Sequence, residues 1–351
     1  MFGSKILIGI IFLFVLCSAA LPAAGDTYYV RPNGNDQAPG STARSAFRSV
    51  RRAAQALNHG DSIVIAPGVY REPAFFAERF SADGAPMAII GDESGRLTGA
   101  APGPVIVEAN DPTRPALHFY RLRNLRISGL TLRGTGQGLK VEKCNGVIVE
   151  RSTFDGLTRG LIASGTNGLR VETSVFKSCT IGAFVQRSVQ TRIAHVTVAG
   201  SSSVGLLVLS SGAGEITNSI LAENNANLIA DQLSAPGWRS DYNVILGTNG
   251  PWGDVPAIAK VYEWNAISGQ DRHSMHVVPA FADSATMNLR ITPDVTWCGG
   301  LPGMNVGQAL DPPVRLDRDG KALRIRNGTV CAGAYDYPCL LYTSPSPRDR
   351  S

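Results

Sequence analysis

The stretch GLKVEKCNGVIVERSTFDGLTR (residues 138–159) is followed directly by GLIASGTNGLRVETSVFKSCTI (160–181) and GAFVQRSVQTRIAHVTVAGSSSV (182–204). Each unit begins with glycine and repeats the same apolar skeleton. The first residues of five such units lie 22 or 23 residues apart and are Ala116, Gly138, Gly160, Gly182 and Gly205. A period this regular predicts a solenoid, in which each repeat covers the apolar face of its neighbour.

Two apolar columns indicate which kind of solenoid this is. Eleven residues after each first residue comes Ile127, Val149, Val171, Ile193 or Ile216, and sixteen after it comes Leu132, Phe154, Phe176, Val198 or Leu221. Runs such as 146–150 are short, β-branched and bounded by turn residues, which is typical of strands. Leucine-rich repeats have a similar period, but they need a leucine framework that these columns lack.

We therefore predict an all-β fold, a parallel β-helix with two or three strands in each turn. Its rungs would lie about 4.8 Å apart, so that equivalent side chains form columns along the axis. The composition agrees, because 38 of 351 residues are glycine, more than the usual ~7%. Every rung needs corners with unusual backbone angles, and glycine adopts them most readily.

The two ends of the chain are set apart from this fold. Residues 1–25 have the layout of a secretory signal peptide, with Lys5, an apolar stretch over 6–16 and small residues before position 26. The apolar stretch is shorter than the ~20 residues that span a bilayer; an uncleaved membrane anchor is the alternative. Residues 339–351 resemble the translation of a transposase-type sequencing adapter, so we do not count them as part of the predicted fold. We expect no membrane span in the mature chain and a secreted, periplasmic or cell-surface location.

The beginning of the mature chain predicts a capping helix. Residues 45–57 place Phe47, Val50, Ala54 and Leu57 at helical spacing. A helix here would plug the open end of the coil, where core and unpaired backbone groups are otherwise exposed.

This N-terminal stretch also carries a family resemblance. The sequences YYV (28–30), NGND (33–36) and GDSIVIAPGVYRE (60–72) closely resemble the N-terminal cap of secreted bacterial right-handed parallel β-helix repeat proteins of the pectate-lyase-like superfamily. The segments 269–274 and 317–337 are similar to the parts that lead out of the coil and close it in those proteins. The resemblance implies one right-handed β-helix domain over 26–338, with its cap at 26–75, regular rungs at 85–230, and lateral loops and an irregular C-terminal closure at 231–338.

The resemblance implies a class of function without fixing the chemistry, since one fold supports many activities. It implies an exported protein that binds an acidic polysaccharide, with or without degrading or modifying it. An enzyme of this kind would be a polysaccharide lyase, a glycoside hydrolase or an epimerase. A non-catalytic cell-surface or envelope protein that binds or serves as a structural spacer is the alternative. Nucleic acid is not an expected partner, because the net charge is only +5 and no basic run is interleaved with aromatic residues.

Two polar columns are the candidate site. Ten residues after each first residue lie Arg126, Ile148, Arg170, Arg192 and Glu215, and in the second column lie Ser128, Glu150, Glu172, Ala194 and Thr217. Both columns flank an inward position, so both point outward from one strand face. We predict that Glu150, Glu172, Arg170 and Arg192 line a carbohydrate-facing patch and supply any catalytic groups. Glu150 and Glu172 are also possible calcium ligands, since Ca²⁺ prefers hard oxygen donors. The alternative is an ordinary solvated face with weak ion pairs.

The remaining residues of chemical interest are interpreted as structural. His195 is expected at a corner or in the core, and His273 and His276 in the segment that leads out of the coil. The tryptophans at 238, 252, 264 and 297 either pin loops to the core or form a sugar-stacking surface. Cys144 and Cys179 are expected to be buried and unpaired, whereas Cys298 and Cys331 are candidates for a disulfide.

Overall fold

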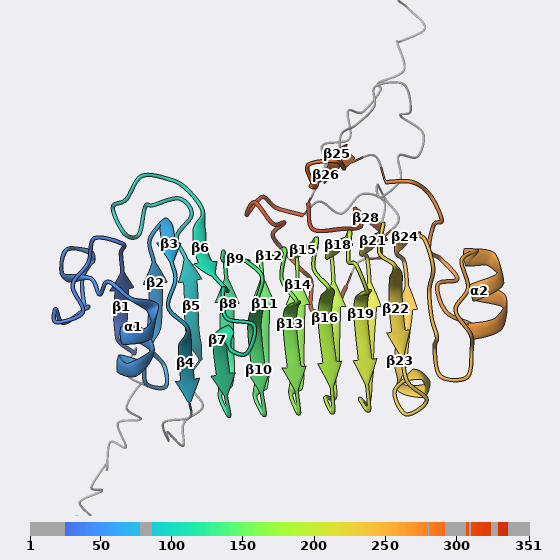
Figure 1. Cartoon of the computed structure of the whole chain (residues 1–351), viewed down its shortest axis with the longest axis horizontal. Helices are drawn as coiled ribbons and strands as arrows, with labels where there is room; N and C mark the ends of the chain where they lie inside the picture. Colours follow the sequence, from blue (N-terminus) through green and yellow to red (C-terminus); the bar gives the residue numbers. More distant parts are fainter. Residues whose placement is uncertain are drawn as a thin grey trace, which may run out of the picture.

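The computed structural model describes residues 25–77, 86–279, 281–291, 307–308, 310–323 and 329–335. The chain winds into a right-handed parallel β-helix of about 8 turns, with the coil axis horizontal in Figure 1. The predicted fold class is confirmed. None of the described helices is both long and apolar enough to cross a membrane. The predicted signal segment and the adapter-like residues lie outside the described residues.

Three parallel sheets form the sides of the coil. Sheet A has nine strands, namely β1 (Thr27–Val30), β2 (Ser62–Ile65), β5 (Met87–Gly91), β8 (Arg123–Ser128), β11 (Asn145–Glu150), β14 (Asn167–Glu172), β17 (Thr191–Ala194), β20 (Gly214–Thr217) and β23 (Trp238–Asp241). Sheet B has eight, namely β3 (Gly68–Tyr70), β6 (Val105–Glu108), β9 (Thr131–Arg133), β12 (Thr153–Asp155), β15 (Val175–Lys177), β18 (Thr197–Ala199), β21 (Ile220–Ala222) and β24 (Val244–Leu246). Sheet C has seven, namely β4 (Ala74–Ala77), β7 (Pro115–Tyr120), β10 (Gln137–Glu142), β13 (Arg159–Ser164), β16 (Ile181–Gln186), β19 (Val204–Leu209) and β22 (Ala226–Ala230).

The interior of the coil is built from the two predicted apolar columns. Val149 pairs in register with Ile127 on one side and with Val171 on the other. Phe154 pairs with Phe176, and their rings stack with centroids 4.5 Å apart and an angle of 3° between the planes. These side chains are completely or almost completely buried. The period of the sequence is thus the length of one turn.

Each end of the coil is covered by a short helix (Figure 1). At the N-terminal end, α1 (Val50–Ala56) is capped by Ser49, whose Oγ accepts a hydrogen bond from the Arg52 backbone N–H at 3.1 Å. The helix buries Val50, Ala53 and Ala54. It is shorter than the predicted pattern over 45–57, so that Phe47 and Leu57 are buried outside its ends. At the other end lies α2 (Val261–Ser268), which the sequence pattern did not indicate. Two short 3₁₀ helices, η1 (Ala43–Ser45) and η2 (Ala235–Gly237), complete the described helices.

The C-terminal part returns along the coil instead of extending it. Two antiparallel pairs occur here, β25 (Phe281–Asp283) with β26 (Asn288–Ile291) and β27 (Gly307–Gln308) with β28 (Thr329–Val330). The Arg318 guanidinium donates two hydrogen bonds of 3.0 Å to the Glu93 carboxylate. The Ala334 backbone N–H donates to Thr197 Oγ1 at 3.0 Å. The returning segment, red in Figure 1, therefore spans several turns of the coil.

Candidate functional site

The two polar columns predicted from the sequence exist as continuous rows on sheet A. Arg126, Ile148, Arg170, Arg192 and Glu215 are consecutive partners in register, and so are Ser128, Glu150, Glu172, Ala194 and Thr217. The second row continues to Asp241, the register partner of Thr217. Asp241 does not follow the sequence period, because the 3₁₀ turn Ala235–Gly237 precedes β23 and lengthens the interval from Thr217.

Arginine side chains neutralise the carboxylates of these rows. Arg126 holds Glu150 through its Nε and Nη2 atoms, with Nη2 2.6 Å from Oε1. Arg170 donates to Glu172 from its own strand, with Nε 2.8 Å from Oε1. Arg192 Nε lies 3.2 Å from Oε1 of Glu215, and its Nη1 donates to the Asp311 and Pro312 carbonyls at 3.3 Å. The pairing is therefore local, and Glu150 takes its cation from Arg126 instead of Arg170 or Arg192.

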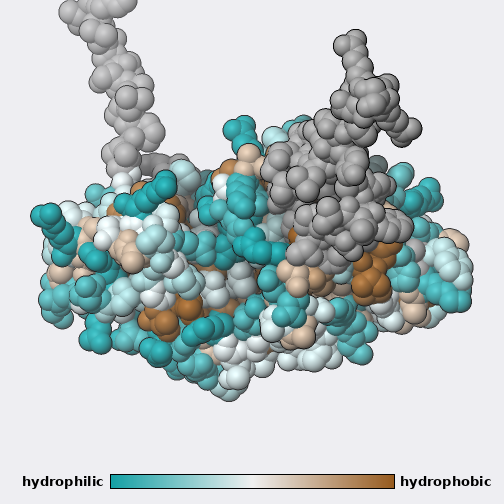
Figure 2. Space-filling model, turned by 90° about the horizontal axis from the view of Figure 1, so that it is seen from above, coloured by the Kyte–Doolittle hydropathy of each residue, from teal (hydrophilic) through white to brown (hydrophobic). Residues whose placement is uncertain are grey.

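The rows form one wall of a groove. A cavity of about 500 Å³ lies between sheet A and the returning C-terminal segment, and it is lined by Arg126, Ile148, Glu150, Arg170, Glu172, Pro312, Pro313, Val314, Arg315 and Leu316. Glu172 points away from the core, yet only 4% of it is exposed. In Figure 2, the face that carries the returning segment is mostly hydrophilic where it is described, with smaller hydrophobic areas between.

The groove carries an excess of positive charge. Arg126, Arg170 and Arg315 line it together with only two carboxylates, those of Glu150 and Glu172. Arg126 and Arg170 each pair with one of the two. Arg315 is exposed and forms no ion pair with any residue that the structure describes. One guanidinium thus faces the groove without a protein counterion from the described part of the chain.

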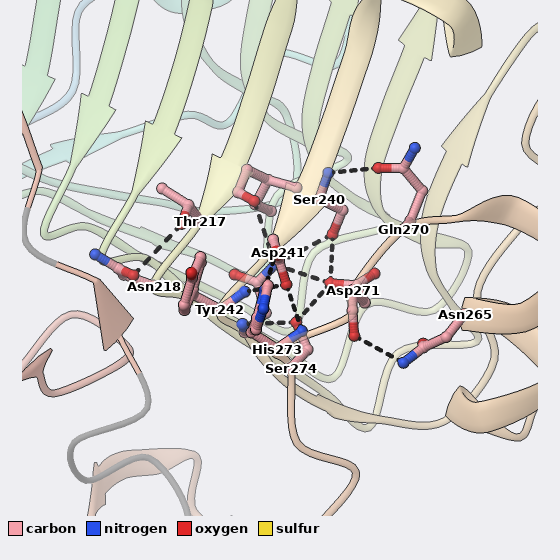
Figure 3. Close-up of polar contacts among 12 residues, drawn as sticks. Thr217, Asn218, Ser240, Asp241, Tyr242, Asn265, Gln270, Asp271, His273 and Ser274 are labelled. Atoms are coloured by element: carbon pink, nitrogen blue, oxygen red, sulfur yellow. Dashed lines mark hydrogen bonds and ion pairs between the residues drawn. The ribbon is translucent and has the colours of Figure 1, made fainter.

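A second polar cluster lies on the same sheet, where the chain leaves the coil (Figure 3). His273 Nδ1 lies 2.7 Å from Asp241 Oδ2, and the His273 backbone N–H donates to Asp241 Oδ1 at 2.7 Å. The Tyr242 ring stacks on the imidazole with 4.8 Å between centroids and 10° between planes. These contacts fix the lead-out segment to β23, in agreement with the structural role predicted for His273.

Next to this cluster, Asp271 is almost fully buried. Its Oδ1 accepts hydrogen bonds from Ser240 Oγ at 2.8 Å and from Ser274 Oγ at 2.7 Å. Its Oδ2 accepts one from Trp264 Nε1 at 2.9 Å. Burial raises the pKa of the Asp271 carboxyl, and the hydrogen bonds oppose that shift. This network (Figure 3) anchors α2 to the last turn of the coil and gives the carboxylate a structural role.

The tryptophans and cysteines bear on three other predictions. Trp238, Trp252 and Trp264 are at most 4% exposed, so they pin loops to the core and form no sugar-stacking surface; Trp297 lies outside the described residues. Cys144 and Cys179 are buried and unpaired, as predicted. Cys298 also lies outside the described residues, so its disulfide with Cys331 stays a prediction.

His195 is a buried corner residue, as predicted. It adopts φ 52° and is 2% exposed. In the part of the chain that the structure describes, no three His, Cys, Asp or Glu side chains form a group able to hold a metal ion.

Comparison with protein families finds one match over the regular rungs. Residues 95–234 match the model described as "Periplasmic copper-binding protein (NosD)". A search of curated proteins finds no significant match.

Several solved structures are similar to this chain at low identity. Pectate lyase Pel9A is 13% identical with a TM-score of 0.42, and the alignment covers 90% of this chain and 97% of that chain. A rhamnogalacturonan lyase is 13% identical with a TM-score of 0.42, covering 63% of this chain and 68% of that one. An alginate lyase from Paenibacillus sp. str. FPU-7 is 14% identical with a TM-score of 0.34, covering 63% of this chain and 87% of that one. The strand register thus shows a right-handed parallel β-helix, and residues 95–234 of this coil resemble the NosD family.

Proposed function

We propose that this is an extracytoplasmic β-helix protein that binds an acidic polysaccharide in the groove between sheet A and residues 312–316. The observation that carries the proposal is the excess of guanidinium groups in that groove, where Arg315 lacks a carboxylate partner among the described residues. The signal-like N-terminus and the periplasmic description of the matched family support the location.

The geometry suits a polymer of acidic sugars. Guanidinium groups bind carboxylates through two parallel hydrogen bonds, which fixes orientation as well as charge. Glu150 and Glu172 hold Arg126 and Arg170 in place, so little side-chain entropy is lost when a ligand binds. Since the rows run along the coil axis at one residue per rung, an extended chain lying in the groove would meet Arg126 and Arg170 two rungs apart.

Within this proposal Arg170 binds the ligand, and Glu150 and Glu172 hold the groove arginines in position. Arg192 does not line the groove and holds the backbone of residues 311 and 312 instead. Arg170 is paired with Glu172. Arg192 is paired with Glu215 and donates to two backbone carbonyls. A lyase needs a group that is able to accept a proton from the sugar ring, and engaged guanidinium groups are poor acceptors. We therefore favour binding without cleavage. Calcium between Glu150 and Glu172 would compete with arginine for the same oxygens, so we propose binding without calcium.

The proposal is tested by titration calorimetry, with and without a chelator, which compares the affinity for polygalacturonate and alginate with the affinity for neutral dextran. Arg315→Ala and Arg170→Ala are each expected to weaken binding about tenfold, the effect of losing one charge-assisted interaction. The matched control is Arg51→Ala, an exposed arginine on α1 at the end of the coil.

Three results would contradict the proposal. Equal affinity for dextran would show that charge does not drive binding. Unchanged affinity in both groove variants would show that the polymer does not bind in this groove. New ultraviolet absorbance from unsaturated sugar ends would show cleavage instead of binding alone.

A further inference from the structure

A cluster of basic residues lies at the corner where the chain passes from sheet C to sheet A. Arg121 lies in the turn between β7 and β8, and Arg123 is the first residue of β8. Lys143 occupies the equivalent turn one rung along, between β10 and β11. A cavity of about 370 Å³ opens at this corner and is lined by Arg121, Arg123, Lys143, Cys144, Asn145, Gly165 and Asn167. We call these seven residues the basic corner.

The three cations of the basic corner have no carboxylate partner among the residues that the structure describes. The nearest acidic residue along the chain, Glu142, is already held by Lys140 Nζ at 2.6 Å and by His118 Nε2 at 3.0 Å. Arg121 and Lys143 instead lie over the ring of Tyr120, 5.2 and 5.6 Å from its centroid. Like charges on neighbouring rungs repel each other, so an anion from outside would relieve the repulsion.

The backbone also shapes this cavity. Arg121 and Lys143 adopt left-handed angles, with φ of 55° and 54°, at the corner where the next rung has Gly165 with φ 62°. Left-handed angles are strained for residues with a Cβ atom and free of strain for glycine. Because Gly165 has no side chain, space stays open beside Lys143, and the amides of Asn145 and Asn167 border it.

We propose that the basic corner binds the phosphoryl group of a phosphate monoester. A phosphate monoester has nearly two negative charges and three strong acceptor oxygens near neutral pH. Three cations and two amide groups line the cavity, which is enough to neutralise both charges and to donate to all three oxygens. A carboxylate has one charge and two oxygens, so it would leave part of this donor set unused.

The experiment is a calorimetric titration of the full chain with glucose 6-phosphate, with inorganic phosphate and glucose as comparators. Arg121→Asn and Lys143→Asn remove the charge while keeping a residue that tolerates left-handed angles. Each is expected to weaken binding of glucose 6-phosphate about tenfold. Unchanged melting temperatures would show that both variants fold.

Arg187→Asn is the matched control. Arg187 occupies the same corner one rung beyond Gly165, is exposed and has φ 48°, but it does not line the cavity. It lies two rungs or about 10 Å from Lys143, beyond the ~8 Å screening length of physiological salt. We expect the affinity of Arg187→Asn for glucose 6-phosphate to stay within about twofold of that of the unmodified chain.

Each outcome decides the proposal. Saturable binding of glucose 6-phosphate that is lost in the two corner variants and kept in the control supports it. Absence of saturable binding, or an equal loss in Arg187→Asn, overturns it, because binding would then be absent or due to diffuse charge. Arg315→Ala should leave this affinity unchanged, so the result is independent of the polysaccharide groove.

Discussion

His195 is expected to make the folded protein sensitive to mild acid. Its Nδ1 lies 3.1 Å from the Cys331 carbonyl oxygen, and its Nε2 lies 3.1 Å from the Asn218 side-chain nitrogen. A carbonyl only accepts and an amide nitrogen only donates, so Nδ1 carries the proton and Nε2 accepts. Both ring nitrogens are thus satisfied by the neutral imidazole. Protonation of Nε2 would place two donors against each other in the core.

The size of the effect follows from the pKa. Burial, together with the nearby Arg192, lowers the pKa of His195 from 6.5 to about 4. Between these values the unfolded chain binds a proton that the folded chain does not, so stability is present above pH 6.5 and is lost as the pH falls. From pH 7 to pH 5 the loss amounts to about 2 kcal/mol, and it reaches roughly 3 kcal/mol below pH 4.

Urea unfolding of the full chain and of His195→Asn at both pH values measures this loss. Asparagine tolerates the left-handed angle at this corner, and the titration of other groups is common to both chains. The unmodified chain should lose about 2 kcal/mol more than the variant between pH 7 and pH 5. An equal loss in the two chains would refute the assignment of a neutral, buried His195.

Two further predictions concern the fold. Phe154→Ala should lower the free energy of unfolding by about 3–5 kcal/mol, because it leaves a cavity in the stacked column. In the same urea assay, Phe75→Ala should lower it by much less, because 54% of Phe75 is exposed. Similar losses in the two variants would show that the stacked column is not the core of the coil. Arg318→Ala should free the C-terminal segment from the coil, because it removes both hydrogen bonds to Glu93. Limited proteolysis should then cut the C-terminal segment faster in Arg318→Ala than in Arg290→Ala. The Arg290→Ala control breaks only an ion pair within the C-terminal region, the one with Asp319. Equal cutting rates in the two variants would contradict the role of Arg318.

The coil itself could be predicted because its contacts repeat. Residues one period apart, such as Phe154 and Phe176, become neighbours in every solenoid of this kind, so spacing alone placed the apolar and polar rows. The helix α1 was predictable for the same reason, since Val50 and Ala54 show a helical period, but its ends were not, because Phe47 and Leu57 continue that period outside the helix. The helix α2 was not, because its place depends on Trp264 bonding to Asp271, a contact with no periodic signal.

The repeating part of the protein could thus be inferred from residue spacing: the turn length, the apolar columns and the outward rows with Glu150, Glu172, Arg170 and Arg192. Three other features emerged only from the folded chain: residues 312–316 return to cover those rows, Arg126 pairs with Glu150, and Asp241 continues the row beyond Thr217. The difference lies in the range of the interactions. Stacking of equal turns is encoded locally and repeated along the chain, whereas the return of the C-terminal segment depends on single contacts between distant residues, such as Arg318 with Glu93.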